Sequence, residues 1–232
     1  MLILALETST EAGSCALWRD GAVLERRCPA GRSHSETLLP LVHELLTEAG
    51  VSVAALDAIA FGAGPGAFTG LRVACAAAQG LAVASGRPLL PVVSLEAMAV
   101  QTGEGKTLAL LDARMGEVYA ARYRVSGGEC QLQGDIRVLP PAALTLPGAA
   151  GWRVCGNALT AYPELAERLQ AAGAPSAALL PDILPTAAAV AALAAPRLRR
   201  GEGIDAALAA PLYIRDKVAK TVAERLGAGG RA

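Results

Sequence analysis

The sequence predicts an α/β fold made of two copies of one βββαβα unit, the second copy being reduced. Three observations support this prediction. An acidic residue closes the first strand of each half, at Glu7 and at Asp112. A hairpin pattern follows each acid, and a glycine ends a later strand of each half, at Gly62 and at Gly156. A long duplicated unit of this kind is an internal repeat rather than a short-period solenoid.

In the first half, apolar residues recur in some segments at the spacing of a strand and in others at the spacing of a helix. Leu38, Val42 and Leu45 recur at helical spacing, and Thr37 as the cap would leave Pro40 in the first turn, where proline is tolerated. The remaining elements follow from apolar runs and from turn residues between them. The expected strands are 2–6, 14–18, 22–28, 56–61 and 89–93, and the expected helices are 37–49 and 71–84.

The second half repeats this order with a shrunken or missing first helix. Its expected strands are 107–112, 117–123, 130–138 and 153–155, and its expected helices are 159–170, 186–199 and 212–226. The predicted units are therefore 1–102, 103–208, and a C-terminal helix over 209–232 that packs back on the first unit and ends in a frayed tail. This organisation indicates the actin-like ATPase (ASKHA) architecture of actin, Hsp70 and sugar kinases, in which two such domains hold a nucleotide.

Composition excludes several classes of protein. With 53% hydrophobic and 18% charged residues, the chain has enough apolar material for a packed core and is not disordered. The 21 basic and 21 acidic residues cancel, which excludes a broad electrostatic grip on nucleic acid by this chain alone. Glu7 interrupts the apolar N-terminus, and the run 187–195 is far shorter than a membrane span. We expect a cytoplasmic protein with no membrane contact.

Metal and nucleophile patterns are weak. The five cysteines are scattered without a C-x-x-C, which favours reduced thiols over disulfides or zinc. His34 and His43 have no carboxylate or cysteine at ligand spacing, and no G-x-S-x-G motif is present. We expect no metal site.

Two glycine-rich segments resemble nucleotide loops only in part. The segment 62–67 follows a strand and precedes a helix, but the acid expected about 20 residues later in a dinucleotide fold is missing. Its glycines still allow close approach of a group, although a tight turn explains them equally well. The segment 103–107 ends like a Walker A loop, yet Val100 replaces the first glycine and a strand follows.

The helix expected at 71–84 is apolar or small nearly all round. A helix of this kind is normally buried on more than one side. Two interpretations remain open: a central helix of the domain, or a helix with one face covered by a partner subunit.

Four segments together resemble the TsaB (YeaZ) family. They are Glu7-Thr8-Ser9, the run 64–72 (GPGAFTGLR), the run 112–119 (DARMGEVY) and the run 211–215 (PLYIR). The resemblance extends from Met1 to about Arg215 in the expected order. It implies an actin-like fold and a role in the synthesis of threonylcarbamoyladenosine (t6A) on bacterial tRNA.

The resemblance also implies partners. In that family the chain is regarded as a non-catalytic scaffold that binds and stabilises the transferase TsaD and acts with the ATPase TsaE, while TsaC supplies the adenylate. Homodimers form through the two helices of the first domain. The implied interface is Leu38, Leu41, Val42, Leu45, Leu71, Arg72, Cys75, Ala78, Gln79 and Ala82. This chain would need no cofactor itself: ATP would be used through TsaE, a nucleotide would be possible at the heterodimer interface, and tRNA would be met only through the complex.

The residues themselves favour a non-catalytic role. Ser94 and Met98 stand where the resemblance places the metal-binding histidine pair of the catalytic paralogue, and neither is a good ligand for a hard or borderline divalent ion. Asp112 is followed by Ala113 rather than by a glycine that would let the backbone wrap a phosphate. The expected vestigial nucleotide cleft comprises Glu7, Thr8, Ser9, Gly62, Gly64, Gly66, Asp112 and Arg114. An actin-like kinase or ATPase is the alternative, and a peptidase of the M22 type is a weaker one.

Overall fold

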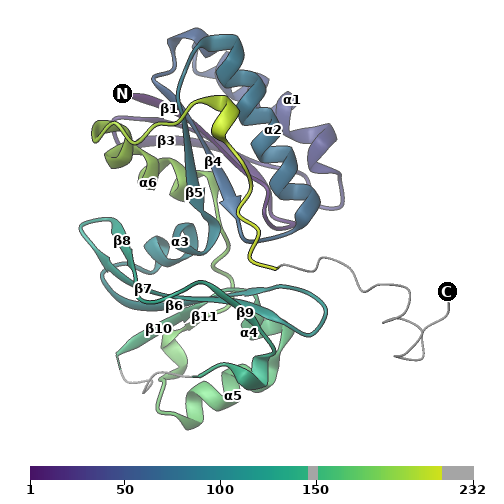
Figure 1. Ribbon diagram of the computed structural model, residues 1–232, viewed down its shortest axis with the longest axis vertical. Coiled ribbons are helices and arrows are strands. Elements are labelled where there is room, and N and C mark those ends of the chain that lie inside the picture. The colour runs from purple at the N-terminus through teal and green to yellow at the C-terminus, as the bar shows by residue number, and fades with distance from the viewer. Residues whose placement is uncertain (146–150, 216–232) are drawn as a thin grey trace, which may run out of the picture.

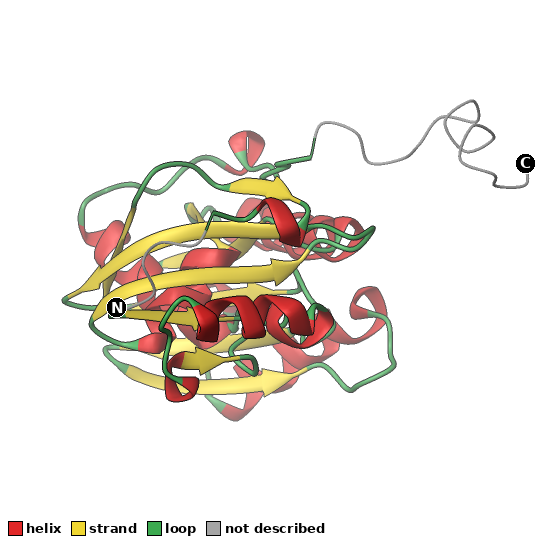
Figure 2. Ribbon diagram, turned by 90° about the horizontal axis from the view of Figure 1, so that it is seen from below, coloured by secondary structure: helices red, strands yellow, loops and turns green. Residues whose placement is uncertain are grey.

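The computed structural model describes residues 1–145 and 151–215, and these form two α/β halves, one above the other in Figure 1. Each half contains one mixed sheet, and Figure 2 shows strands flanked by helices. The prediction of an α/β fold from two related units is confirmed, because both sheets have the same strand order. Residues 216–226 of the predicted C-terminal helix, and the predicted frayed tail, lie outside the described residues.

The N-terminal sheet has the order β3-β2-β1-β4-β5. Strands β1 to β3 form an antiparallel meander, and β4 and β5 add in parallel on the other side of β1. The parallel pairing brings the ends of β1 and β4 to one edge of the sheet. The strands are β1 (Leu2–Glu7), β2 (Ser14–Arg19), β3 (Ala22–Arg27), β4 (Ala58–Gly64) and β5 (Leu89–Val93).

The C-terminal sheet repeats that order as β8-β7-β6-β10-β11, with β9 also paired to β7. Here the expected third strand, 130–138, is two short strands, separated by a turn that contains Gly134 at φ 87°. The strands are β6 (Gly105–Asp112), β7 (Val118–Ser126), β8 (Glu129–Leu132), β9 (Arg137–Leu139), β10 (Trp152–Cys155) and β11 (Leu179–Leu180).

Helices α1 (His34–Glu48) and α2 (Phe68–Ser85) cover one face of the N-terminal sheet. Buried Leu38 and Leu45 of α1 pack there with Phe61 of β4. By length and composition alone, α2 could span a membrane, as could the core helix of many folded domains. In this structure the inner side of α2 packs on the sheet. The core interpretation therefore accounts for one side of α2.

Helix α1 begins a full turn earlier than predicted. Its N-cap is Ser33, not Thr37, so Pro40 lies inside the helix rather than in the first turn. The early start brings His34 within reach of the β1–β2 loop, where its Nε2 lies 2.8 Å from the carbonyl oxygen of Thr10. The Thr37 hydroxyl donates to the Ser33 carbonyl at 3.0 Å instead of capping the helix. Tertiary contacts at the first turn thus outweigh the local cost of the proline.

Helix α6 (Ala187–Arg199) covers the opposite face of the N-terminal sheet. It lies within the predicted C-terminal unit, 103–208, but its buried Val190 and Leu193 pack against strands β1, β2, β4 and β5. Helix α6 thus lies in the second predicted unit along the sequence and packs on the sheet of the first unit. Small alanines along α6 allow the helix to approach the sheet closely.

The C-terminal half has less helix. Helix α3 (Ser94–Ala99) packs on one face of its sheet, whereas α4 (Ala158–Ala161) and α5 (Pro163–Ala171) pack on the other. The single helix expected at 159–170 is broken because Pro163 starts a new helix and Tyr162 before it leaves the helical conformation, with φ -132° and ψ 82°. Short 3-10 helices occur at Val53–Ala55, Val100–Thr102, Pro141–Ala143, Ser176–Ala178 and Ala206–Leu208.

The chain returns to the N-terminal half before it ends. Ile204 bridges to Leu89 at the edge of β5, and Gln79 of α2 donates to the carbonyls of Ala206 and Ala209 at 2.9 and 3.1 Å. Residues 212–215 have no regular secondary structure where a helix was expected, and this yellow segment descends beside α2 toward the C-terminal half (Figure 1). We call residues 212–215 the strap.

Candidate functional site

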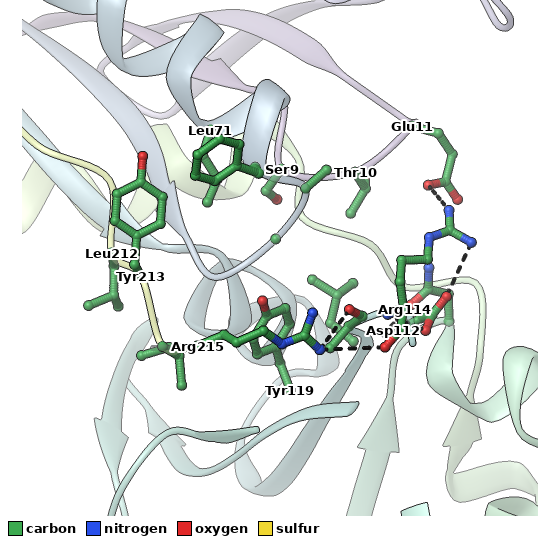
Figure 3. Close-up of a pocket in the computed structure, with 17 residues that line it drawn as sticks. Ser9, Thr10, Glu11, Leu71, Asp112, Arg114, Tyr119, Leu212, Tyr213 and Arg215 are labelled. Carbon is green, nitrogen blue, oxygen red and sulfur yellow. Dashed lines mark hydrogen bonds and ion pairs between the residues drawn. The ribbon is translucent and has the colours of Figure 1, made fainter. Parts of the chain in front are cut away.

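A cavity of about 190 Å³ lies between the two halves. The β1–β2 loop and the start of α2 line it from one side, the β6–β7 turn lines it from the other, and the strap closes it (Figure 3). Its lining residues are Ser9, Thr10, Glu11, Gly66, Ala67, Phe68, Leu71, Leu111, Asp112, Ala113, Arg114, Tyr119, Asn157, Leu212, Tyr213, Ile214 and Arg215.

Only part of the predicted cleft lines this cavity. Ser9, Gly66, Asp112 and Arg114 do so, whereas Glu7, Thr8, Gly62 and Gly64 lie behind it. Glu7 is completely buried, and its carboxylate accepts from the Ser9 amide at 2.5 Å and from the Ser94 hydroxyl at 3.3 Å. Burial raises the pKa of Glu7 above its usual value, and these hydrogen bonds oppose the shift only in part.

The glycines of this region allow the chain to approach itself. A Cβ on Gly62 would lie 1.9 Å from Oε2 of Glu7, and a Cβ on Gly66 would lie 2.4 Å from the Ser9 carbonyl oxygen. A Cβ on Gly64, whose φ is 114°, would lie 2.9 Å from the carbonyl oxygen of Leu212. Of the two explanations that the sequence left open for these glycines, the distances favour a close approach of other groups. The groups that approach include the β1–β2 loop and the strap of the same chain.

Asp112 is at the end of β6, and a strained turn follows it. Arg114 and Met115 have φ values of 60° and 57°, a region that residues with a side chain rarely adopt. The Arg114 amide donates to Oδ1 of Asp112 at 2.8 Å, and the hydroxyl of Tyr162 donates to the same oxygen at 3.0 Å. The guanidinium of Arg114 lies 3.3 Å from Asp112 and 3.8 Å from Glu11 (Figure 3).

The strap contributes residues that sequence analysis did not assign to the cleft. The Leu212 amide donates to the carbonyl of Ala63 at 2.7 Å, which adds the strap to the end of β4. Tyr213 stacks on Phe68, and Arg215 reaches the β6–β7 turn. The run 211–215 belongs to the motifs that resemble the family, so the sequence did mark this segment. The helix expected over 212–226 gave no reason to place it at the cleft.

Ser94 and Met98, the two positions of the expected histidine pair, lie in the interior. Ser94 donates to Glu7, and Met98 packs in the core between α3 and the C-terminal sheet. Within residues 1–145 and 151–215, His, Cys, Asp and Glu side chains do not gather into a group of three that fits a metal ion.

The predicted partner-interface residues are mostly internal. Leu38, Val42, Leu45, Leu71, Cys75, Ala78 and Ala82 are buried within the chain, whereas Leu41 and Gln79 are half-buried and Arg72 is exposed. The periodic pattern identified the covered faces of α1 and α2 correctly, but the cover is the chain's own sheet. Most of these side chains are therefore already covered within the chain, and their contact with a partner stays a prediction.

The outward face of α2 carries a different set of small and apolar side chains. Ala76, Gly80, Val83 and Ala84 are exposed, and Val83 is 75% exposed. On neighbouring α1, Leu39 is 50% exposed. We call these five residues the α2 face.

Comparison with known proteins gives consistent matches. A family model described as "TsaD: tRNA N6-adenosine threonylcarbamoyltransferase" matches residues 28–223. The TsaB protein of Escherichia coli, a "tRNA threonylcarbamoyladenosine biosynthesis protein", is 37% identical, with 94% of this chain and 96% of the relative covered. The Haemophilus influenzae protein of the same name is 43% identical over 51% of this chain and 52% of its own length.

Solved structures agree. A structure entitled "YeaZ from Pseudomonas aeruginosa" is 42% identical, with a TM-score of 0.80, and covers 91% of this chain and 99% of its own. A second Pseudomonas aeruginosa structure, described as an uncharacterized protein with similarity to peptidase YEAZ, has a TM-score of 0.83 at 42% identity, covering 92% and 99%.

Proposed function

Because the chain belongs to the TsaB (YeaZ) family and takes part in tRNA threonylcarbamoyladenosine biosynthesis, we propose that it is a scaffold that binds and stabilises the TsaD transferase. The α2 face is the proposed binding surface. TsaE is proposed to join the assembled pair and supply ATP hydrolysis. The same face is proposed to form a homodimer when the transferase is absent.

Gly80 is the observation that carries this proposal. It lies in the middle of α2, where glycine costs about 1 kcal/mol relative to alanine. A Cβ at this position would have open space within 4 Å, so packing within the described chain gives no reason for the glycine. A second helix that approaches closely would give one, because small residues let two backbones come together.

The rest of the α2 face supports the same reading. Exposed Ala76, Val83 and Ala84 are uncharged, and the side chain of Val83 is largely in solvent. An apolar patch of this kind, displayed by two adjacent helices, is typical of a protein–protein interface. On α1, which packs beside α2, Leu39 is also exposed.

A non-catalytic role is supported by the cleft. The cavity holds Asp112, but its Oδ1 oxygen is engaged by Tyr162 and by the Arg114 amide. Burial places Glu7 behind the cavity rather than in it. An actin-like ATPase remains the alternative, and it requires nucleotide turnover that is lost in Asp112→Asn.

The binding test uses Ala76→Arg, with Ala171→Arg as the matched control. Both alanines are exposed on helices, Ala76 on α2 and Ala171 on α5 of the other half. Neither change enters the core, so the free energy of unfolding should stay within about 0.5 kcal/mol in both. Calorimetric titration with TsaD should show at least a tenfold loss of affinity for Ala76→Arg only. Equal affinity of the two variants would exclude the α2 face.

A further inference from the structure

An actin-like fold implies a nucleotide between the two halves, and the residues of this cleft do not fit one. The cavity of about 190 Å³ is smaller than the roughly 300–1,000 Å³ of most small-molecule sites. Two guanidinium groups line it, and both already have carboxylate partners. Arg114 pairs with Glu11 and Asp112, and Arg215 pairs with Glu117. A polyphosphate would have to displace these pairs.

The β6–β7 turn also presents the wrong polarity for a phosphate. A phosphate is bound by amide donors, as at a helix N-terminus or in a glycine-rich nest. Here the carbonyl oxygens of Ala113 and Arg114 accept from Nη2 of Arg215 at 3.1 and 3.5 Å, as the dashed lines in Figure 3 show. The turn is therefore arranged around a cation supplied by the strap.

The other end of the strap is fixed to the N-terminal half. Its Leu212 amide bonds to the end of β4, next to Gly64, where only a glycine leaves room for the Leu212 carbonyl. One residue later, the Tyr213 hydroxyl accepts from Nε of Arg72 at 3.0 Å. The guanidinium of Arg72 in turn lies 3.7 Å from the centre of the Phe68 ring. These contacts hold the strap to both β4 and α2.

We propose that the strap is an intrachain clamp that joins the two halves and closes the cleft in the place of a nucleotide. Leu212 and Tyr213 grip the N-terminal half, and Arg215 inserts its guanidinium into the C-terminal half. Charge-assisted hydrogen bonds from Arg215 to the strained turn and to Glu117 make that end specific. Closure therefore needs no ligand.

The test measures hydrogen exchange and thermal stability of the full chain. Arg215→Met removes the guanidinium but keeps an apolar stem, and Tyr213→Phe removes only one hydroxyl, so that a folded variant is available if the first is unstable. Arg26→Met is the control, because Arg26 and its partner Glu48 both belong to the N-terminal half. Each protein is measured alone and with 1 mM Mg-ATP.

The clamp predicts that exchange of the Leu212 amide and of the 113–117 turn is at least tenfold faster in Arg215→Met, faster to a smaller degree in Tyr213→Phe, and unchanged in Arg26→Met. It also predicts that Mg-ATP leaves the melting temperature of the natural chain unchanged. A nucleotide present at 100 times its Kd would raise that temperature by about 5–10 °C. Such a rise, or unchanged exchange in both strap variants, would overturn the proposal.

Discussion

Replacement of Gly62 by alanine tests why a glycine stands in β4. A Cβ there would lie 1.9 Å from Oε2 and 2.6 Å from Cδ of Glu7. Because Glu7 is completely buried and bonded to Ser9 and Ser94, its carboxylate cannot simply swing into solvent. Overpacking costs about 1–3 kcal/mol, and disturbing hydrogen bonds to a charged group adds about 1.5–3 kcal/mol.

We therefore expect Gly62→Ala to lower the free energy of unfolding by about 3–5 kcal/mol, which corresponds to about 6–20 °C in melting temperature for a chain of this size. The assay is urea unfolding without any ligand, for the natural chain, each single variant, and the double variant Gly62→Ala/Glu7→Ala. The double variant should lose less than the sum of the singles, because the shorter side chain at position 7 makes room for the new methyl group.

Two results would refute this reasoning. A stability for Gly62→Ala within about 0.5 kcal/mol of the natural chain would show that Glu7 does not demand the glycine. Strict additivity in the double variant would show that the two residues do not compete for the same space. In either case the glycine would need another explanation, such as a bound group.

Three further predictions concern buried charge and the α2 face. Burial raises the pKa of Glu7 above its usual 4.5, so the folded protein holds the Glu7 proton more tightly than the unfolded chain does. The free energy of unfolding therefore falls as pH rises above 4.5. Urea midpoints measured from about pH 4.5 to 8 should fall less steeply in Glu7→Gln than in the natural chain. An equal slope in both proteins would exclude Glu7 as the source. Nη2 of Arg197 lies 2.5 and 2.6 Å from the two carboxylate oxygens of buried Glu96, so Arg197→Met leaves that carboxylate without its cation. The free energy of unfolding in urea should fall by about 3–5 kcal/mol. The double variant Arg197→Met/Glu96→Leu should regain most of that stability. A double variant no more stable than the single one would show that the unpaired charge is not the cause. Gly80→Ala should raise the stability of the isolated chain by about 0.5–1 kcal/mol while weakening its binding to TsaD, and stronger binding would contradict the role of Gly80 in a close contact.

The repeated organisation could be predicted from the sequence because its signals are local. Glu7 and Asp112 close first strands, Gly62 lies near the end of β4, and Gly156 follows β10, so the common order of elements along the two halves could be predicted from the residue pattern. The sequence pattern predicted a helix at 186–199, but the alanine-rich surface of α6 does not specify which sheet it covers. Only the three-dimensional packing placed its Val190 on the N-terminal sheet.

The candidate site could be predicted only in part, because most of its contacts join distant parts of the chain. Hydrophobic period distinguished covered from exposed helix faces but could not tell whether Ala78 is covered by its own sheet or by a partner. The motif at 211–215 was recognised, yet the contact between Arg215 and the β6–β7 turn joins residues about 100 positions apart. Contacts of that separation leave no periodic signal in one sequence.

The most direct test of the proposed scaffold role is light scattering after size exclusion, on the chain alone and mixed with the TsaD of the same organism. The scaffold proposal predicts a stable one-to-one complex that replaces any homodimer, and loss of both assemblies in Ala76→Arg but not in Ala171→Arg. Two separate peaks at the masses of the unmixed proteins, with and without nucleotide and TsaE, would contradict it.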